Sequence, residues 1–93
     1  MIYVDNMKVL FGSMIMCHLL SDNFSKKGHE ELLRMVDKIG VQRKWIQQEG
    51  TIYEHFDICL SKRRKALEFG AKEIHYGRPL AELLRRKKVQ ADE

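Results

Sequence analysis

"HFDICLSKRRKALEFGA", residues 55–71, decides the fold, because a strand, a helix and a helix stop follow one another within it. Its first residues, together with the preceding TIYE, alternate apolar and polar side chains as a half-buried strand does. From Ser61 onward the pattern is typical of a helix, and Gly70 suits the left-handed conformation that commonly ends one. A short strand at about 72–76 would follow, which makes this stretch the joint of an α/β unit.

The rest of the chain carries further strand and helix patterns. MIYVDN at 1–6 alternates with a period of two, and MIMCHLL at 14–20 is apolar, so both predict strands. HEELLRMVDKIG at 29–40 predicts a helix with acidic residues in its first turn. GRPLAELLRRKK at 77–88 predicts a last helix with Pro79 in its first turn.

These patterns predict a simple domain organisation. The 93 residues are 44% apolar and 32% charged, as in ordinary folded proteins, and suffice for one core. We expect a small single α/β domain over residues 1–89, with a short, mostly parallel or mixed sheet, about three helices and a frayed tail at 90–93. Residues 41–50 fit no single pattern.

Charge, cysteine content and hydropathy limit the classes of function. The formal net charge of +4 favours an anionic partner such as a nucleotide or a nucleic acid. Two cysteines without a Cys-x-x-Cys spacing give no disulfide framework, which favours a reducing cytoplasm. The apolar run 14–20 is too short to span a membrane, and a chain this small would gain from forming a homo-oligomer.

The cationic run 62–65 stands where a helix begins, at the positive end of the backbone dipole. In one interpretation, Ser61 caps this helix, and the free N–H groups after it join Arg63 and its neighbours around a phosphate or a carboxylate. In the other, Arg63 lies in the inward-facing stripe and pairs with a carboxylate of the protein, such as Asp57 or Asp5. The sequence leaves both open.

Histidine and aspartate side chains form a second candidate site. On a strand, His55 and Asp57 project from the same face. If the strand ends are neighbours, His18 and either Asp5 or Asp22 converge with them and supply polar specificity, a general base or a metal site. The spacings fit no closed structural zinc site, so we expect no metal and no cofactor. If a metal is bound, the expected ligands are Asp5, His18 and Asp57.

Trp45, the only tryptophan, follows Arg43 and Lys44. An aromatic face beside cations suits a nucleobase whose phosphates meet the charges. A lone tryptophan in a small protein is also a common core residue, because its ring buries much area. The sequence does not decide between these two roles.

Four stretches resemble a known family: IYVDN (2–6), HLLSD (18–22), EELLRMVDKIGVQRKWIQ (30–47) and HFDICLSKRRKALEFGA (55–71). Together they resemble short phage and bacterial proteins classified as domain of unknown function number 4031, over roughly the first three quarters of the chain. The resemblance implies a phage or bacterial setting and a candidate site, and it implies no particular reaction.

The family motifs are a His-x-x-x-Asp, a Gly followed by basic residues and an aromatic-x-Gln, and a His-aromatic-Asp preceding Ser-Lys-Arg. Residue by residue, they fall on His18 and Asp22, on Gly40 to Gln47, on His55, Phe56 and Asp57, and on Ser61, Lys62 and Arg63. This chain differs in having Phe56 where a Tyr is more usual and a longer loop, NFSKKGH, before the first helix.

Three functions of different classes follow, and whether the chain is an enzyme stays open. The first is a binding module for a small phosphorylated or nucleotide-like anion, which in a phage would sequester a signalling nucleotide in the host cytoplasm. Its ligand-binding residues would be Arg63, Lys62, Ser61, His55, Asp57, His18 and Trp45. The second is a small metal-dependent phosphoesterase or nuclease in which Arg63 stabilises transition-state charge. The third is a nucleic-acid-binding accessory protein.

Overall fold

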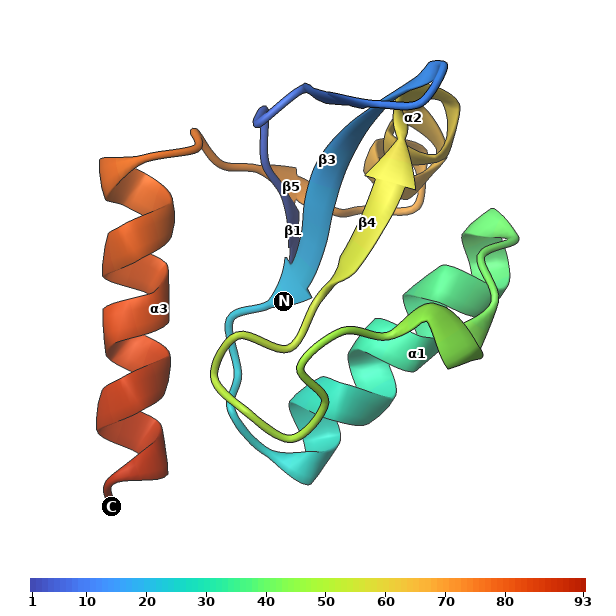
Figure 1. The fold of residues 1–93 in the computed structure, drawn as a ribbon. Helices are drawn as coiled ribbons and strands as arrows, with labels where there is room; N and C mark the ends of the chain where they lie inside the picture. The colour runs from blue at the N-terminus through green and yellow to red at the C-terminus, as the bar shows by residue number, and fades with distance from the viewer.

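A computed structural model describes residues 1–93 as one α/β domain, in which helices pack against a mixed five-stranded sheet (Figure 1). This confirms the α/β class and the mixed sheet expected from the sequence. No helix has the length and apolar character needed to cross a membrane. The strands are β1 (Ile2–Val4), β2 (Val9–Phe11), β3 (Met14–Ser21), β4 (Phe56–Cys59) and β5 (Lys72–Glu73). The helices are α1 (Lys26–Ile39), the 3-10 turn η1 (Arg43–Trp45), α2 (Leu60–Glu68) and α3 (Arg78–Ala91).

The central strand is β3, which is long enough to pair with three neighbours. β4 runs antiparallel along one of its edges, while β1 and β2 lie end to end, also antiparallel, along the other. β5 extends the sheet by pairing parallel to β1. The pairing of β2 is displaced by two residues from that of β1, because the chain bulges between them, with Lys8 in the left-handed region at φ 52°.

The two faces of the sheet carry different kinds of side chain. Residues paired across neighbouring strands share a face, so the register places Val4, Leu19 and Phe56 together on one side. The next row, His18 opposite Asp57, projects from the other side. One face is therefore apolar except for the buried Ser21, and the other carries the candidate functional groups.

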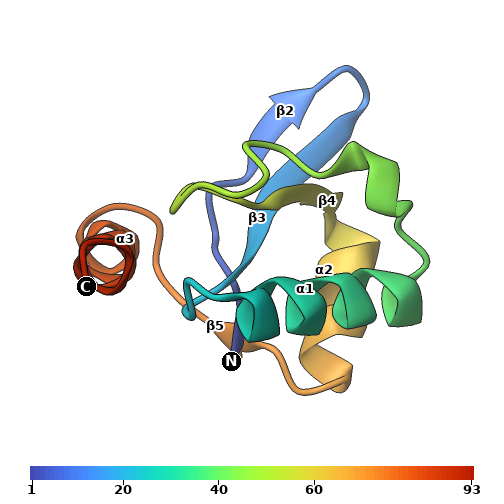
Figure 2. The same ribbon diagram turned by 90° about the horizontal axis from the view of Figure 1, so that it is seen from below.

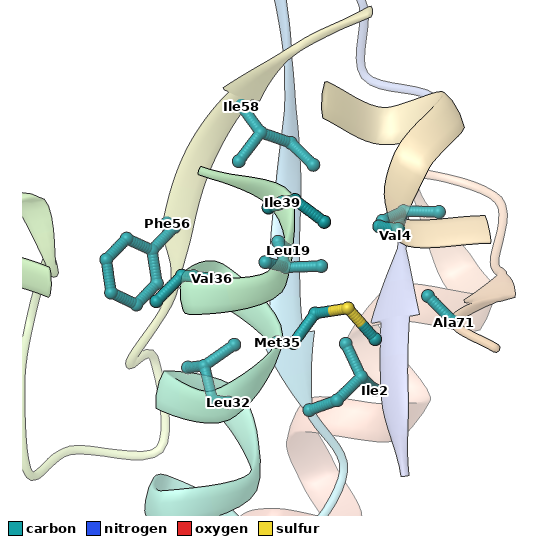
Figure 3. Packing of buried hydrophobic residues seen from close by; sticks show 11 residues of the cluster. Ile2, Val4, Leu19, Leu32, Met35, Val36, Ile39, Phe56, Ile58 and Ala71 are labelled. Atoms are coloured by element: carbon teal, nitrogen blue, oxygen red, sulfur yellow. The ribbon is translucent and has the colours of Figure 1, made fainter. Parts of the chain in front are cut away.

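Helices α1 and α2 cover the apolar face and form the main core with it (Figure 3). Leu32, Val36 and Ile39 project from one stripe of α1, as the sequence pattern predicts, and all three are fully buried. Burying each such side chain contributes about 1.5–3 kcal/mol. The core is completed by these buried residues: Ile2, Val4, Leu19, Met35, Phe56, Ile58, Ala66 and Ala71.

Helix α3 packs separately, beyond the edge formed by β1 and β5 (Figure 2). Its Leu80 and Leu83 meet Leu20 on the face that α1 and α2 leave free, with Tyr3 packed against them. Because α3 lies at one side, the rest of this face is bordered by the β2–β3 hairpin and by the segment that runs from η1 to β4 (Figure 2). The candidate site lies there.

Three differences from the sequence expectations have local causes. β2 was not predicted because it has only three residues, all of them exposed. α1 begins at Lys26, not at His29, because the Ser25 Oγ caps it by accepting the N–H of Gly28 at 3.1 Å, which moves the acidic residues out of the first turn. α3 continues to Ala91, beyond the predicted end of the ordered chain.

The start of α1 generates a prediction about Gly28. A helical Gly→Ala change usually stabilises a helix by about 1 kcal/mol. Here an added Cβ would overlap the carbonyl oxygen of Asn23, so we expect Gly28→Ala to destabilise the protein by about 1–3 kcal/mol. Denaturant unfolding measures it, with the exposed neighbour Lys27→Ala as the control that stays near neutral. A rise in stability for Gly28→Ala would show that the 23–28 turn is not this tight.

Candidate metal centre

Three side chains meet on the open face of the sheet: His18 from β3, Asp57 from β4 and His55 from the residue before β4. His18 lies opposite Asp57 in the register, and the bridge between Gln47 and His55 fixes the chain before β4. The Nε2 atom of His18 lies 3.8 Å from Asp57 Oδ1, and that of His55 lies 3.5 Å from the same oxygen. The imidazole rings meet edge to face with centroids 4.9 Å apart. The convergence that the sequence left conditional is therefore present.

Each member of this triad is held by a partner behind it. Asp5 Oδ2 lies 2.6 Å from Nδ1 of His18, and the Tyr53 carbonyl lies 2.6 Å from Nδ1 of His55. Since a carboxylate and a carbonyl only accept hydrogen bonds, both Nδ1 atoms carry a proton, and in the neutral rings both Nε2 atoms keep a free lone pair. Asp57 is held through Oδ2, which accepts a hydrogen bond from Gln47 Nε2 at 2.5 Å.

The oxygen of Asp57 that faces the two histidines lacks a hydrogen-bond donor. Oδ1 is buried and unpaired, and the two Nε2 atoms are too far away to serve as donors. A buried acceptor without a partner lowers the stability of a fold by about 1–3 kcal/mol, so an unpaired Oδ1 at this position needs a physical reason. A cation held between Oδ1 and the two Nε2 atoms would provide one.

The donor set suits a transition metal in an open, catalytic type of site. All three ligand atoms lie within 4.8 Å of one another. Bonds of about 2.0–2.2 Å in a tetrahedral site place ligand atoms about 3.3–3.6 Å apart, so a small contraction would close the triad on an ion. Two imidazoles and one carboxylate are the ligands of catalytic zinc and of facial iron sites, which leave positions for water and substrate.

Asp5 lies behind the triad and not within it, which differs from the ligand set expected from the sequence. It is fully buried, and its Oδ1 accepts the N–H groups of His18 (2.8 Å) and Met7 (3.2 Å) while Oδ2 holds the His18 ring. Burial opposes ionisation of Asp5, but the hydrogen bonds from His18 and Met7 outweigh it and lower the pKa of the carboxyl. The bond to Asp5 raises the pKa of His18 against the effect of burial. A carboxylate behind a histidine is the common outer partner of a metal ligand.

The basic residues at the start of α2 do not join the triad. Arg63 is largely buried, and it donates from Nε to the Asp5 carbonyl at 2.8 Å and from a terminal nitrogen to Glu73 at 3.3 Å. Of the two interpretations of Arg63, the one in which it pairs within the protein is the closer. Its partners are the backbone carbonyl of Asp5 and the carboxylate of Glu73, in place of the expected carboxylate of Asp57 or Asp5. The Lys62 ammonium lies against Gly40 at the C-terminus of α1, where a cation is favoured.

The prediction that Ser61 caps α2 is wrong. The N-cap is Cys59, because β4 runs directly into the helix, and Ser61 lies in the first turn with its Oγ 3.2 Å from the Cys59 sulfur. α2 packs on the covered face of the sheet, whereas His18 and Asp57 project from the opposite face. The other residue expected in the site, Asp22, lies 3.0 Å from the amino group of Met1.

Two grooves flank the triad, and sequence reasoning missed most of their residues. The larger, of about 440 Å³, is lined by Met7, Val9, Phe11, Met16, His18, Trp45, Gln47, His55 and Asp57. The smaller, of about 220 Å³, is lined by His18, Leu20, Gln48, Tyr53, His55, Tyr76, Leu80 and Leu84. Trp45 is 58% exposed, so it is not a core residue. Among the lining residues that the sequence analysis did not single out as ligand-binding, only Gln47 had a signal, as the last residue of the aromatic-x-Gln motif.

These features define a small α/β protein with a candidate metal centre on the open face of its sheet. A family model described as "Protein of unknown function (DUF4031)" matches residues 2–87, so the chain belongs to that family. No match was found among curated proteins or among solved structures.

The Asp5–His18 pair generates a prediction for the metal-free protein. Asp5→Asn removes the negative charge and keeps the shape, so the pKa of His18 should fall toward its ordinary value of 6.5. A raised folded-state pKa stabilises the fold below pH 6.5 and stops doing so as pH rises through that pKa. The stability lost in Asp5→Asn should therefore be greatest in mildly acidic solution and shrink above neutrality. NMR titration of the His18 ring, with the exposed His75 as internal reference, checks this. An unchanged His18 pKa would contradict the pairing.

Proposed function

We propose that this protein is a divalent-metal-dependent hydrolase of phosphate esters, with His18, His55 and Asp57 as the metal ligands. The observation that carries the proposal is the set of three convergent, unpaired ligand atoms, one of them a buried carboxylate oxygen with no donor. A three-ligand set leaves coordination positions open, which suits catalysis better than structural support. The net charge of +4 favours anionic substrates.

The chain's own residues divide the work of this site. A divalent ion there would supply Lewis-acid chemistry, polarising a phosphoryl oxygen and acidifying a water molecule. Asp5 and the Tyr53 carbonyl select the Nδ1–H tautomer of the neutral His18 and His55 rings, so that the Nε2 atoms face Asp57 Oδ1. Gln47 holds Asp57 so that Oδ1 faces the histidines. Because these supports lie on strands or are fixed by the sheet, the ligands are oriented before an ion binds.

The sequence-based hypothesis of a non-enzymatic anion-binding module has less support. That hypothesis needs Arg63 and Lys62 free to meet a ligand beside His55. Arg63 is engaged by Asp5 and Glu73, and Lys62 lies against the end of α1. The polar triad therefore has no cationic side chain of the α2 run beside it, and a metal ion is the more direct source of positive charge.

Three other expectations from the sequence stay predictions. They are homo-oligomerisation, a cytoplasmic location and a phage or bacterial setting with a nucleotide-like ligand. The exposed apolar side chains of the β2–β3 hairpin, Val9, Leu10, Phe11, Met14 and Ile15, are compatible with an oligomer contact.

Metal titration of three variants tests the proposal. We expect His55→Gln and Asp57→Asn to lower the affinity for Zn²⁺ or Mn²⁺ at least tenfold and to abolish chelator-sensitive hydrolysis of bis(p-nitrophenyl) phosphate. Asp57→Asn should leave the metal-free protein about as stable as the wild type, because it removes the negative charge from a carboxylate whose buried Oδ1 has no donor. His75→Gln, at an exposed position outside the triad, is the matched control and should change neither readout.

Calorimetry and a chelator-controlled rate assay give the result. Metal affinity that is equal in all four proteins, or hydrolysis that survives loss of the triad, would contradict the proposal.

A further inference from the structure

The two grooves beside the triad form one trough across the open face of the sheet. His18 and His55 line both grooves, so the triad lies where they meet. A substrate held in both grooves would therefore extend to either side of the metal ligands. This geometry differs from a blind pocket, in which the reacting group is the end of the substrate.

Exposed aromatic rings stand along both parts of the trough. Phe11 (76% exposed) and Trp45 (58%) line the larger groove, and Tyr53 (51%) and Tyr76 (56%) line the smaller one. Aromatic side chains usually bury most of their area, so four exposed rings on one face indicate a surface that binds flat partners.

The lining of the trough carries little charge, and exposed cations flank the larger groove. This arrangement suits a polyanion whose bases enter the grooves and whose backbone meets the cations. No Lys, Arg or Glu lines either groove, and Asp57 is the one acidic lining residue. Exposed cations stand beside the larger groove instead: Lys8 lies between the lining residues Met7 and Val9, and Lys44 precedes Trp45. Arg43 is not available, because Asp37 binds it at 2.6 Å and 3.0 Å.

We propose that the trough binds single-stranded nucleic acid, with a backbone phosphate at His18, His55 and Asp57 and bases stacked on the rings to either side. Stacking on exposed rings is open to unpaired bases and closed to bases inside a duplex. The larger groove, of about 440 Å³, has the size of a small-molecule site, and the smaller, of about 220 Å³, lies below that range, so each would hold only a short part of a strand.

The inference rests on the proposed function and deepens it by naming the substrate. In the reaction, a water oxygen bonds to phosphorus, the bond from phosphorus to one ester oxygen breaks, and that oxygen takes up a proton. The products are a strand ending in a phosphate monoester and a strand ending in a hydroxyl. Because the chain occupies both sides of the triad, cleavage is internal.

Binding is measured first without catalysis, so that its failure is separate from that of the proposed function. The probe is a fluorescein-labelled twelve-nucleotide single strand, as RNA and as DNA, with Asp57→Asn protein in chelator. We expect saturable binding that weakens with salt, quenching of Trp45 fluorescence, and at least tenfold weaker binding of the same sequence as a duplex. In that background, Phe11→Ala and Tyr76→Ala should each weaken single-strand binding on the order of fivefold or more.

The matched control is Phe69→Ala in the same background. Phe69 is 52% exposed, but it follows α2 and lies against Lys38, outside both grooves. Its removal should leave binding unchanged. Equal losses for Phe69, Phe11 and Tyr76 would overturn the trough, as would equal affinity for duplex and single strand.

Cleavage is then tested with metal-loaded wild-type protein and an oligonucleotide blocked at both ends. Products cut inside the blocked strand support the inference. Binding without cleavage would support the trough as a binding site and contradict the proposed hydrolysis. Hydrolysis of bis(p-nitrophenyl) phosphate without oligonucleotide binding would support the hydrolase and contradict the trough as its substrate site. Trp45 quenching that rises with protein concentration alone, together with a dimer in sedimentation, would show that a second copy covers the face and would overturn the inference.

Discussion

The buried carboxylate of Asp5 is the constraint on which the rest of the site depends. It lies where β1 ends and the chain bulges before β2, and it replaces a backbone acceptor by taking the N–H of His18. The same group fixes the His18 ring, while its own carbonyl is satisfied by Arg63 from α2. Loss of this carboxylate would leave buried donors unpaired at the point where sheet register, α2 and the triad meet.

The two faces of the sheet show how stability and function are divided. On one face, α1 and α2 bury the apolar rows of β1, β3 and β4 with few polar interruptions. On the other, an unpaired Asp57 oxygen, two histidines with free nitrogens and four exposed aromatic rings lie between α3 and the hairpin. Such groups are unfavourable for folding alone, and the core on the opposite face offsets their cost. Local disagreement with folding rules commonly marks a functional site.

The sequence predicted the parts of the fold that depend on local pattern. The helix around Leu32, Val36 and Ile39 and the joint between β4 and α2 follow from periodicity, as does the shared face of His55 and Asp57. What it could not supply is register. Whether His18 meets Asp57 depends on the pairing of β3 with β4, which joins residues about forty positions apart and has no signature in either strand alone. The destination of Arg63 likewise depends on where the bulge after β1 leaves an unpaired carbonyl.

Anomalous diffraction from crystals of the protein loaded with Zn²⁺ tests the central claim most directly. The account predicts one strong peak about 2.0–2.2 Å from His18 Nε2, His55 Nε2 and Asp57 Oδ1, with Asp5 still bonded to His18 and not to the metal. A peak with Asp5 as a direct ligand, or no peak between the three side chains at saturating metal, would contradict it.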